Sequence, residues 1–170
     1  MVCAPTTGHM EVSGASLAGL AAKHAFKLSC VNGTPGQELE INLPQIVDAF
    51  TGKTVLDVKF KTDIKVPGAM TQNTCFNDPG IVPDDPTVGF NRIVGSTVGT
   101  MDKGVQGIYL AEYQFRDGGK VIGDPNGDAG FWKITVFSGP LAGTFIATSD
   151  PGGSLILLDK GNQKAKPNAS

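Results

Sequence analysis

The segment Thr54–Val66 constrains the fold most, because apolar and charged side chains alternate along it. Successive side chains of an extended chain point to opposite faces, so this pattern predicts a strand with one buried and one solvated face. At about 3.3 Å per residue the strand would be roughly 43 Å long and would need partners along its whole length. The sequence therefore predicts a β-barrel or a β-sandwich. The expected inward side chains are Leu56, Val58, Phe60, Thr62, Ile64 and Val66.

Further short apolar stretches follow the same pattern and are separated by turn residues. The chain has 170 residues, and its 23 glycines and 11 prolines lie between the apolar runs, where they punctuate strands. We expect an all-β fold, namely a single antiparallel β-barrel of about eight strands (calycin-like), with a β-sandwich as the alternative. Other expected strands are 24–31, 38–43, 87–101, 105–116, 129–138, 141–148 and 154–160. In the strand 87–101, Val88, Phe90, Val94 and Val98 share one face, and Gly89, Gly95 and Gly99 share the other.

The expected domain organisation is an N-terminal arm (1–13) with room for one short strand (9–13), a single β domain (14–160) and a flexible tail (161–170). The stretch 14–25 alone has helical character, and a short helix and an extended segment fit it equally well. Residues 67–86 hold four prolines and no regular pattern. We interpret them as a lid over one end of the fold or as a proline-stiffened surface excursion.

The net charge of −2 offers no basic stripe, which argues against nucleic acid and anionic membranes as partners. No run reaches the roughly 20 apolar residues that span a bilayer, and no signal peptide is visible at the start. A cytoplasmic protein and a mature secreted domain both fit. Motifs for phosphate, dinucleotide or nucleophilic-serine sites are also missing, and we expect no metal or organic cofactor.

The three cysteines, Cys3, Cys30 and Cys75, are an odd set. Our main interpretation is free, buried thiols, and a Cys30–Cys75 bridge is the alternative. The two histidines, His9 and His24, stand apart from other metal ligands, so a zinc site is not expected. Residues 124–130 place oxygen-bearing side chains at alternate positions, as a calcium loop does, but without its glycine and glutamate. A plain turn explains them better.

Aromatic side chains dominate the predicted interior, and buried phenols and indoles need hydrogen-bond partners. Such a set can line a mostly apolar pocket, although the same rings could simply fill a closed core. We predict Tyr109, Tyr113 and Glu112 as catalytic residues. Glu112 faces outward unless a bulge between Gly104 and Gly107 reverses it. The predicted substrate-binding residues are Phe26, Phe60, Phe115 and Trp132.

Three segments resemble the small cyclase barrels that include allene oxide cyclases, dirigent proteins and spirotetronate-forming cyclases. They are Val94-Gly-Ser-Thr-Val-Gly-Thr-Met101, Gly107-Ile-Tyr-Leu-Ala-Glu-Tyr-Gln-Phe-Arg-Asp-Gly-Gly119 and Val136-Phe-Ser-Gly-Pro-Leu-Ala-Gly-Thr-Phe-Ile-Ala-Thr148. The resemblance covers less than half of the chain, and no catalytic residue transfers position by position. It implies a barrel that folds a reactive, largely apolar substrate into one conformer without a cofactor.

We therefore predict a β-barrel that binds an apolar small molecule, with possible cyclase or isomerase activity and a possible homo-oligomer. The alternative is a non-enzymatic structural or adhesive β-sandwich of an extracellular or virion assembly, which the glycosylation motif Asn32-Gly-Thr34 supports. A carbohydrate-binding or calcium-stabilised module is a third possibility. An interior cavity would favour the first prediction, and a solid core with exposed edge strands would favour assembly.

Overall fold

The computed structural model describes residues 7–63 and 71–167, and the regular structure of this part is entirely β. Eight strands form a closed antiparallel ring in the order β1-β2-β3-β4-β6-β7-β8-β10, and β10 pairs again with β1. This confirms the all-β, barrel-like prediction. The strands are β1 (His9–Leu17), β2 (Lys23–Ser29), β3 (Glu38–Val47), β4 (Thr54–Thr62), β5 (Gln72–Phe76), β6 (Arg92–Met101), β7 (Tyr109–Arg116), β8 (Ala129–Val136), β9 (Phe145–Thr148), β10 (Ile156–Lys160) and β11 (Lys164–Lys166).

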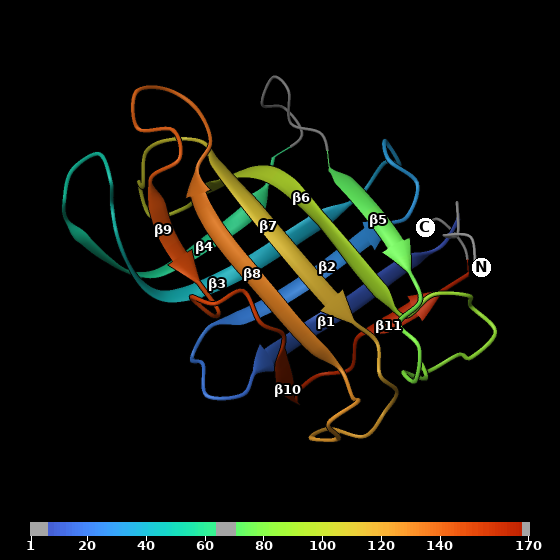
Figure 1. Cartoon of the computed structure of the whole chain (residues 1–170). Coiled ribbons are helices and arrows are strands. Elements are labelled where there is room, and N and C mark those ends of the chain that lie inside the picture. Colours follow the sequence, from blue (N-terminus) through green and yellow to red (C-terminus); the bar gives the residue numbers. More distant parts are fainter. Residues whose placement is uncertain (1–6, 64–70, 168–170) are drawn as a thin grey trace.

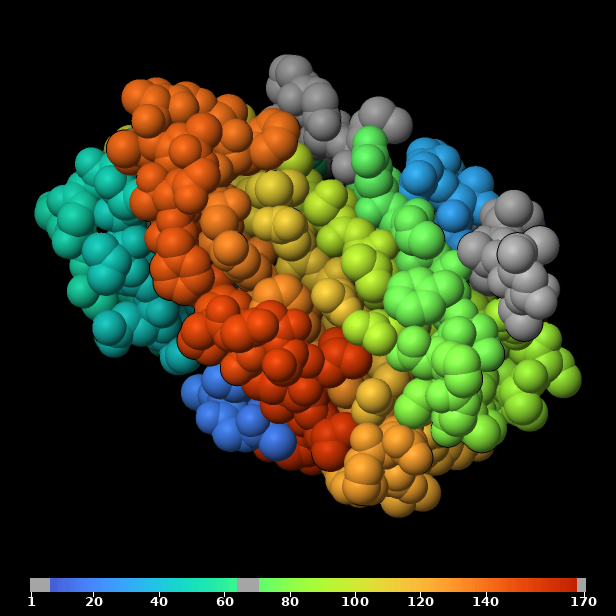
Figure 2. Space-filling view, in the orientation of Figure 1, coloured from blue at the N-terminus to red at the C-terminus, as the bar shows by residue number. Residues whose placement is uncertain are grey.

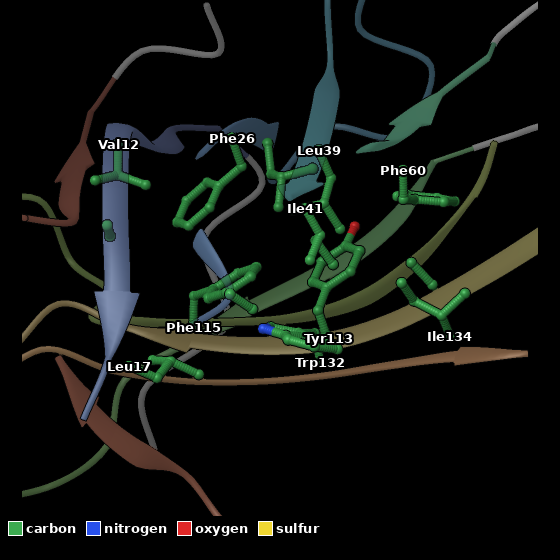
Figure 3. Close-up of a cluster of buried hydrophobic side chains, with 14 of the residues drawn as sticks. Val12, Leu17, Phe26, Leu39, Ile41, Phe60, Tyr113, Phe115, Trp132 and Ile134 are labelled. Carbon is green, nitrogen blue, oxygen red and sulfur yellow. The ribbon is translucent and has the colours of Figure 1, made fainter. Parts of the chain in front are cut away.

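The ring has two walls that face each other across one core. In Figure 1, β6, β7 and β8 cross in front of β1 to β4. Alternation along each strand sends one set of side chains between the walls, as expected for a strand with one buried face. Figure 3 shows Val12, Phe26, Leu39 and Ile41 from the first wall pointing toward Tyr113, Phe115, Trp132 and Ile134 from the second.

The strand that we expected over Thr54–Val66 ends at Thr62 in the structure, and Ile64 and Val66 lie outside the described residues. Val58 and Phe60 are buried as predicted, but Leu56 is 61% exposed. Asp57 causes this difference, because its φ of 53° is left-handed and interrupts the alternation of the strand. Before Asp57, Val55 packs partly against the core instead of Leu56.

The proposed short helix is absent, since 9–17 and 23–29 are strands and no helix occurs in the described part of the chain. This part accordingly holds no helix that is long and apolar enough to cross a membrane. The short strand that we allowed at 9–13 is the first part of β1, whereas the expected flexible tail contains a strand. Most of β1 comes from the arm, β11 comes from the tail, and the two strands pair with each other.

Of the segment 67–86, residues 67–70 lie outside the described residues, and 71–86 are not a continuous loop, because β5 lies within them and pairs with β6. A disulfide joins Cys75 of β5 to Cys30 after β2, so the free-thiol interpretation is wrong for these two cysteines and the bridge is confirmed. Cys3 lies outside the described residues. β5 thus belongs to the sheet through β6 and is tied to the opposite wall through the disulfide.

The face of β6 that carries Gly95 and Gly99 is the inner face. Gly95 lies opposite Tyr113 and Gly99 lies opposite Tyr109 on β7. A side chain at Gly99 would clash with the Lys61 carbonyl oxygen and come within 2.8 Å of Phe60 Cζ. Glycine therefore lets β6 approach β4 closely where large rings fill the interior.

Candidate functional site

Six of the seven predicted site residues share the core. Tyr109, Tyr113 and Phe115 come from β7, as the alternation predicted, and all are at most 1% exposed. Glu112 faces the other way, is exposed, and lies opposite Ser96 of β6 and Lys133 of β8. The other three predicted site residues that lie in the core are Phe26, Phe60 and Trp132.

Both phenols already have hydrogen-bond partners. Tyr113 Oη donates to Asn73 Oδ1, and Tyr109 Oη donates to the Gln106 carbonyl oxygen. Burial raises the pKa of Tyr113, and burial together with the nearby Asp48 carboxylate raises the pKa of Tyr109 to about 12. The two side chains are therefore neutral donors at physiological pH.

The rings around Phe115 stack directly on one another. The ring centroid of Phe115 lies 4.2 Å from that of Phe26, 5.2 Å from that of His24 and 5.5 Å from that of Tyr113. These are contact distances for aromatic pairs. A ligand could enter between these rings only by displacing one of them.

One ring of the set, Phe26, also borders a hollow of about 490 Å³. It lies where β1 changes partners, since His9 to Glu11 pair with β11 whereas Ser16 and Leu17 pair with β10. Between these pairings β1 has an irregular register, and the chain passes from β10 to β11 opposite it. We call this space the seam hollow. Its lining residues are Glu11, Val12, Ser13, Gly14, Phe26, Gly161, Asn162, Lys164 and Lys166.

The lining of the seam hollow is apolar on the inside and polar on the outside. Phe26 and Val12 are buried core residues, 4% and 7% exposed. Toward solvent, Lys166 Nζ forms an ion pair with Glu11, and its hydrogen bond lowers the pKa of that carboxyl. Lys164 adds a second ammonium group. The lining therefore combines two buried apolar side chains with cationic and anionic groups.

Asn162, one of the lining residues, has a buried acceptor without a partner in the described part of the chain. Its Nδ2 donates to Asp84 Oδ2 at 3.2 Å, which directs the amide. Its Oδ1 is buried and has no hydrogen-bond partner within residues 7–63 and 71–167. A buried acceptor without a partner costs free energy, so a donor from a bound molecule would be favourable there.

Next to the seam, the side chain of Gln163 lies in the core and determines which ring nitrogen of His24 carries the proton. Gln163 Nε2 donates to the carbonyl oxygens of Arg116 and Ala129, so its Oε1 is the acceptor that faces His24 Nε2 at 2.8 Å. His24 Nε2 must then carry the proton, and Nδ1 carries the lone pair. Burial lowers the pKa of His24 to about 4, although the hydrogen bond to Gln163 opposes this. The imidazole is therefore neutral.

Two buried aspartates hold the chain around the seam. Asp128 accepts from Gly118 N at 2.8 Å and from Gln163 N at 2.6 Å. Asp117 accepts from Ala165 N at 2.8 Å. Burial raises the pKa of both carboxyls, for Asp128 to about 7, while the backbone donors oppose it. The oxygens of Asp128 thus serve the backbone, and no cluster of three or more potential metal ligands occurs in the described part of the chain.

Sequence reasoning identified Phe26 but missed the other seam residues, because it assigned them to an arm, a tail and a possible helix. The alternation in Lys164-Ala165-Lys166 was a signal, since Ala165 is buried between two more exposed lysines. Three residues are too short a pattern to predict a strand. Their pairing with the start of the chain is a tertiary property.

Comparisons with known proteins give no relative: no protein-family profile, no curated protein and no solved structure matches this chain. The resemblance to small cyclase barrels therefore stays a prediction.

Proposed function

We propose that this protein binds a small molecule in the seam hollow, with the apolar part of the ligand toward Phe26 and Val12. The observation that carries the proposal is the break between β10 and β11, which leaves a core ring at the base of a surface hollow. Its volume of about 490 Å³ lies within the usual range of small-molecule sites, roughly 300–1,000 Å³. The stacked rings fill the predicted interior site, which by the criterion stated above favours assembly, so the proposal keeps the predicted ligand class only by moving its site to the seam.

The chemistry of the rim narrows the ligand. Asn162 Oδ1 lacks a donor, so a hydroxyl or N–H group on the ligand would satisfy it. Glu11 is already paired with Lys166, whereas Lys164 has no ion pair with any other described residue. An acidic group on the ligand would therefore find a counter-ion at Lys164. The best-supported ligand is a small molecule that combines an apolar part with a hydrogen-bond donor and an acidic group.

The more specific proposal of cyclase or isomerase activity rests on the resemblance alone. The phenols of Tyr109 and Tyr113 are engaged with protein acceptors, and the rings pack on one another. Binding and orientation of a substrate are therefore better supported than acid–base catalysis by these two residues.

The experiment measures binding of anilinonaphthalene sulfonate, which combines apolar rings, an N–H donor and a sulfonate. Gly14 offers a direct way to fill the hollow, because a Cβ built there meets no atom within 4 Å and its φ is not left-handed. We expect Gly14→Leu to weaken dye binding at least tenfold. Ala18→Leu is the matched control, since Ala18 is an exposed residue near the end of the same strand and does not line the hollow.

Equal dye affinity in wild type, Gly14→Leu and Ala18→Leu would contradict the proposal. Circular dichroism must show the same fold in all three proteins. Native mass spectrometry of the purified wild type then asks which molecules copurify, and their loss from Gly14→Leu would identify the natural ligand class.

Assembly is a second candidate, favoured by apolar side chains on the outer surface. Val47 is 54% exposed and Leu56 is 61% exposed, and both lie on the outer face of the hairpin that β3 and β4 form. Light scattering after gel filtration tests this candidate. A monomer at all concentrations would contradict it, and an oligomer that Leu56→Lys dissociates would support it.

A further inference from the structure

The turn that joins β2 to β3 contains Asn32-Gly33-Thr34, a sequence that accepts N-linked glycans. Neither candidate function uses this turn. It lies at the surface, where Asn32 and Gly33 are exposed. Figure 2 shows the segment around it (light blue, upper right) standing out beside β5. The modification is therefore sterically open in the folded protein.

The disulfide next to this turn indicates a suitable compartment. Cys30, two residues before Asn32, is bonded to Cys75. Disulfides of this kind form and persist in oxidising compartments and are rare in reducing ones. The secretory pathway is such a compartment, and it also holds the machinery for N-glycosylation.

The orientation of the Asn32 amide leaves its nitrogen available. Asn73 N donates to Asn32 Oδ1 at 2.7 Å, which identifies the oxygen, and Nδ2 takes no part in this bond. Thr34 Oγ1 donates to the Val31 carbonyl oxygen at 2.7 Å, which closes the turn. A Cβ built on Gly33 meets no atom within 4 Å, so the space beside the turn is open.

We propose that Asn32 Nδ2 is the attachment site of an N-linked glycan. The donor is a polyprenyl-diphosphate-linked oligosaccharide. The bond between C1 of its first sugar and the diphosphate oxygen breaks, the diphosphate leaves with the electron pair, and C1 bonds to Nδ2, which loses one proton. The product is still an amide, so Oδ1 keeps its hydrogen bond from Asn73 N.

Asn73 provides an internal contrast, because it begins Asn73-Thr74-Cys75, a rarer form of the same motif. Its side chain is 7% exposed, and Nδ2 donates to the Ser29 carbonyl oxygen at 3.0 Å and to Gln37 Oε1 at 2.9 Å. A glycan on this nitrogen would replace one of its two N–H donors and place a sugar where Ser29 and Gln37 pack, which would separate β5 from β2. The folded structure therefore tolerates a glycan at Asn32 and not at Asn73.

The test is secretion of the full chain from eukaryotic cells, followed by peptide N-glycosidase treatment and peptide mapping. We expect a glycosidase-sensitive band and a glycopeptide that contains Asn32. In Asn32→Asp a carboxylate oxygen still accepts from Asn73 N while the acceptor nitrogen is gone, so this protein should fold, be secreted and lack the glycan at this position.

Thr34 supplies an independent pair of variants that leaves Asn32 unchanged. Thr34→Ser keeps both the motif and the hydroxyl group, and it should retain the glycan. Thr34→Val keeps the shape but removes the hydroxyl, and it should lose the glycan. Secreted wild type with unmodified Asn32, or with a glycan only at Asn73 or at Asn168 of the C-terminal Asn168-Ala-Ser170 motif, would overturn the proposal.

Discussion

Individual buried polar residues carry much of the specificity of this fold. Gln163 is fully buried and uses its amide for three partners on three different segments. Because a buried polar group without a partner is costly, the geometry of these segments is coupled through one side chain. His24 is the partner whose contribution depends on pH.

We predict that His24 makes the protein less stable in acid. The pKa of His24 is lowered to about 4, so between pH 4 and 6.5 the unfolded chain binds a proton that the folded chain does not. The stability contributed by neutral His24 is complete above pH 6.5 and is lost as pH falls toward 4. Relative to His24→Gln, wild type should gain about 3 kcal/mol between pH 4 and pH 7.

Urea unfolding of both proteins at several pH values measures this difference. Asp128 has a raised pKa and contributes the opposite slope between about pH 4 and pH 7, but it does so in both proteins and drops out of the comparison. If the free energies of unfolding of the two proteins instead change with pH in parallel, His24 takes up a proton as readily in the folded state as in the unfolded state.

Gly99 is a second residue for which we predict how a substitution changes stability. A methyl group there would meet the Lys61 carbonyl oxygen and Phe60 Cζ, which are held by the pairing of β4 with β6. Gly99→Ala should destabilise the protein by about 2 kcal/mol or more. Gly14→Ala, where the added atom meets nothing, is the control and should be neutral or slightly stabilising. Thermal melts of the wild type and both variants measure these differences.

At the scale of elements, β5 is held to the two walls by different means. Among the strands of residues 7–63 and 71–167, it pairs by backbone hydrogen bonds with β6 alone. Side chains and one disulfide join it to the β2–β3 turn, through Asn73 and Cys75. Tyr113 Oη, deep in the core, donates to the same Asn73. β5 covers the core at this edge, and its position there therefore depends on the Cys30–Cys75 bond.

We predict that replacing both Cys30 and Cys75 by serine loosens β5 before it unfolds the ring. The bridge closes a loop with a sequence separation of 45, for which chain entropy gives about 3–4 kcal/mol. Hydrogen exchange should rise first at Gln72–Phe76, while the amides of β7 stay protected. Uniform loss of protection in β5 and β7 would instead mean that the sheet unfolds as one unit.

At the scale of the whole molecule, the first and last described strands close the structure together. β1 pairs with β2, β10 and β11, so the first and last strands of the described part of the chain meet at the seam. The backbone donors of Gln163 and Ala165 serve Asp128 and Asp117 on the other wall. The seam hollow therefore exists only when the chain is complete through β11.

Deletion of residues 164–170 should lower stability and abolish dye binding together. The deletion removes β11, leaves Asp117 without the Ala165 donor, and takes away two lysines of the hollow. We expect a loss of roughly 2 kcal/mol or more, measured by urea unfolding, because a buried carboxylate loses a donor. Unchanged stability and unchanged dye affinity would show that β11 is dispensable for the fold and the site.

Local alternation in the sequence by itself determined the all-β class and the inward direction of the rings on β7 and β8. Side-chain direction in a strand follows from the backbone geometry of neighbouring residues, so Tyr109, Tyr113 and Trp132 could be assigned to the core without knowing their partners. The same rule failed at Leu56, where the left-handed Asp57 changes the direction of the chain.

Only the tertiary structure decided which segments meet. The contacts of Gln163 with His24, of Cys30 with Cys75 and of β1 with β11 join residues far apart in sequence, and no local pattern encodes them. Tertiary packing also decided that the rings fill the interior and that a hollow lies at the seam, because the volume left between two walls depends on how all their side chains fit together.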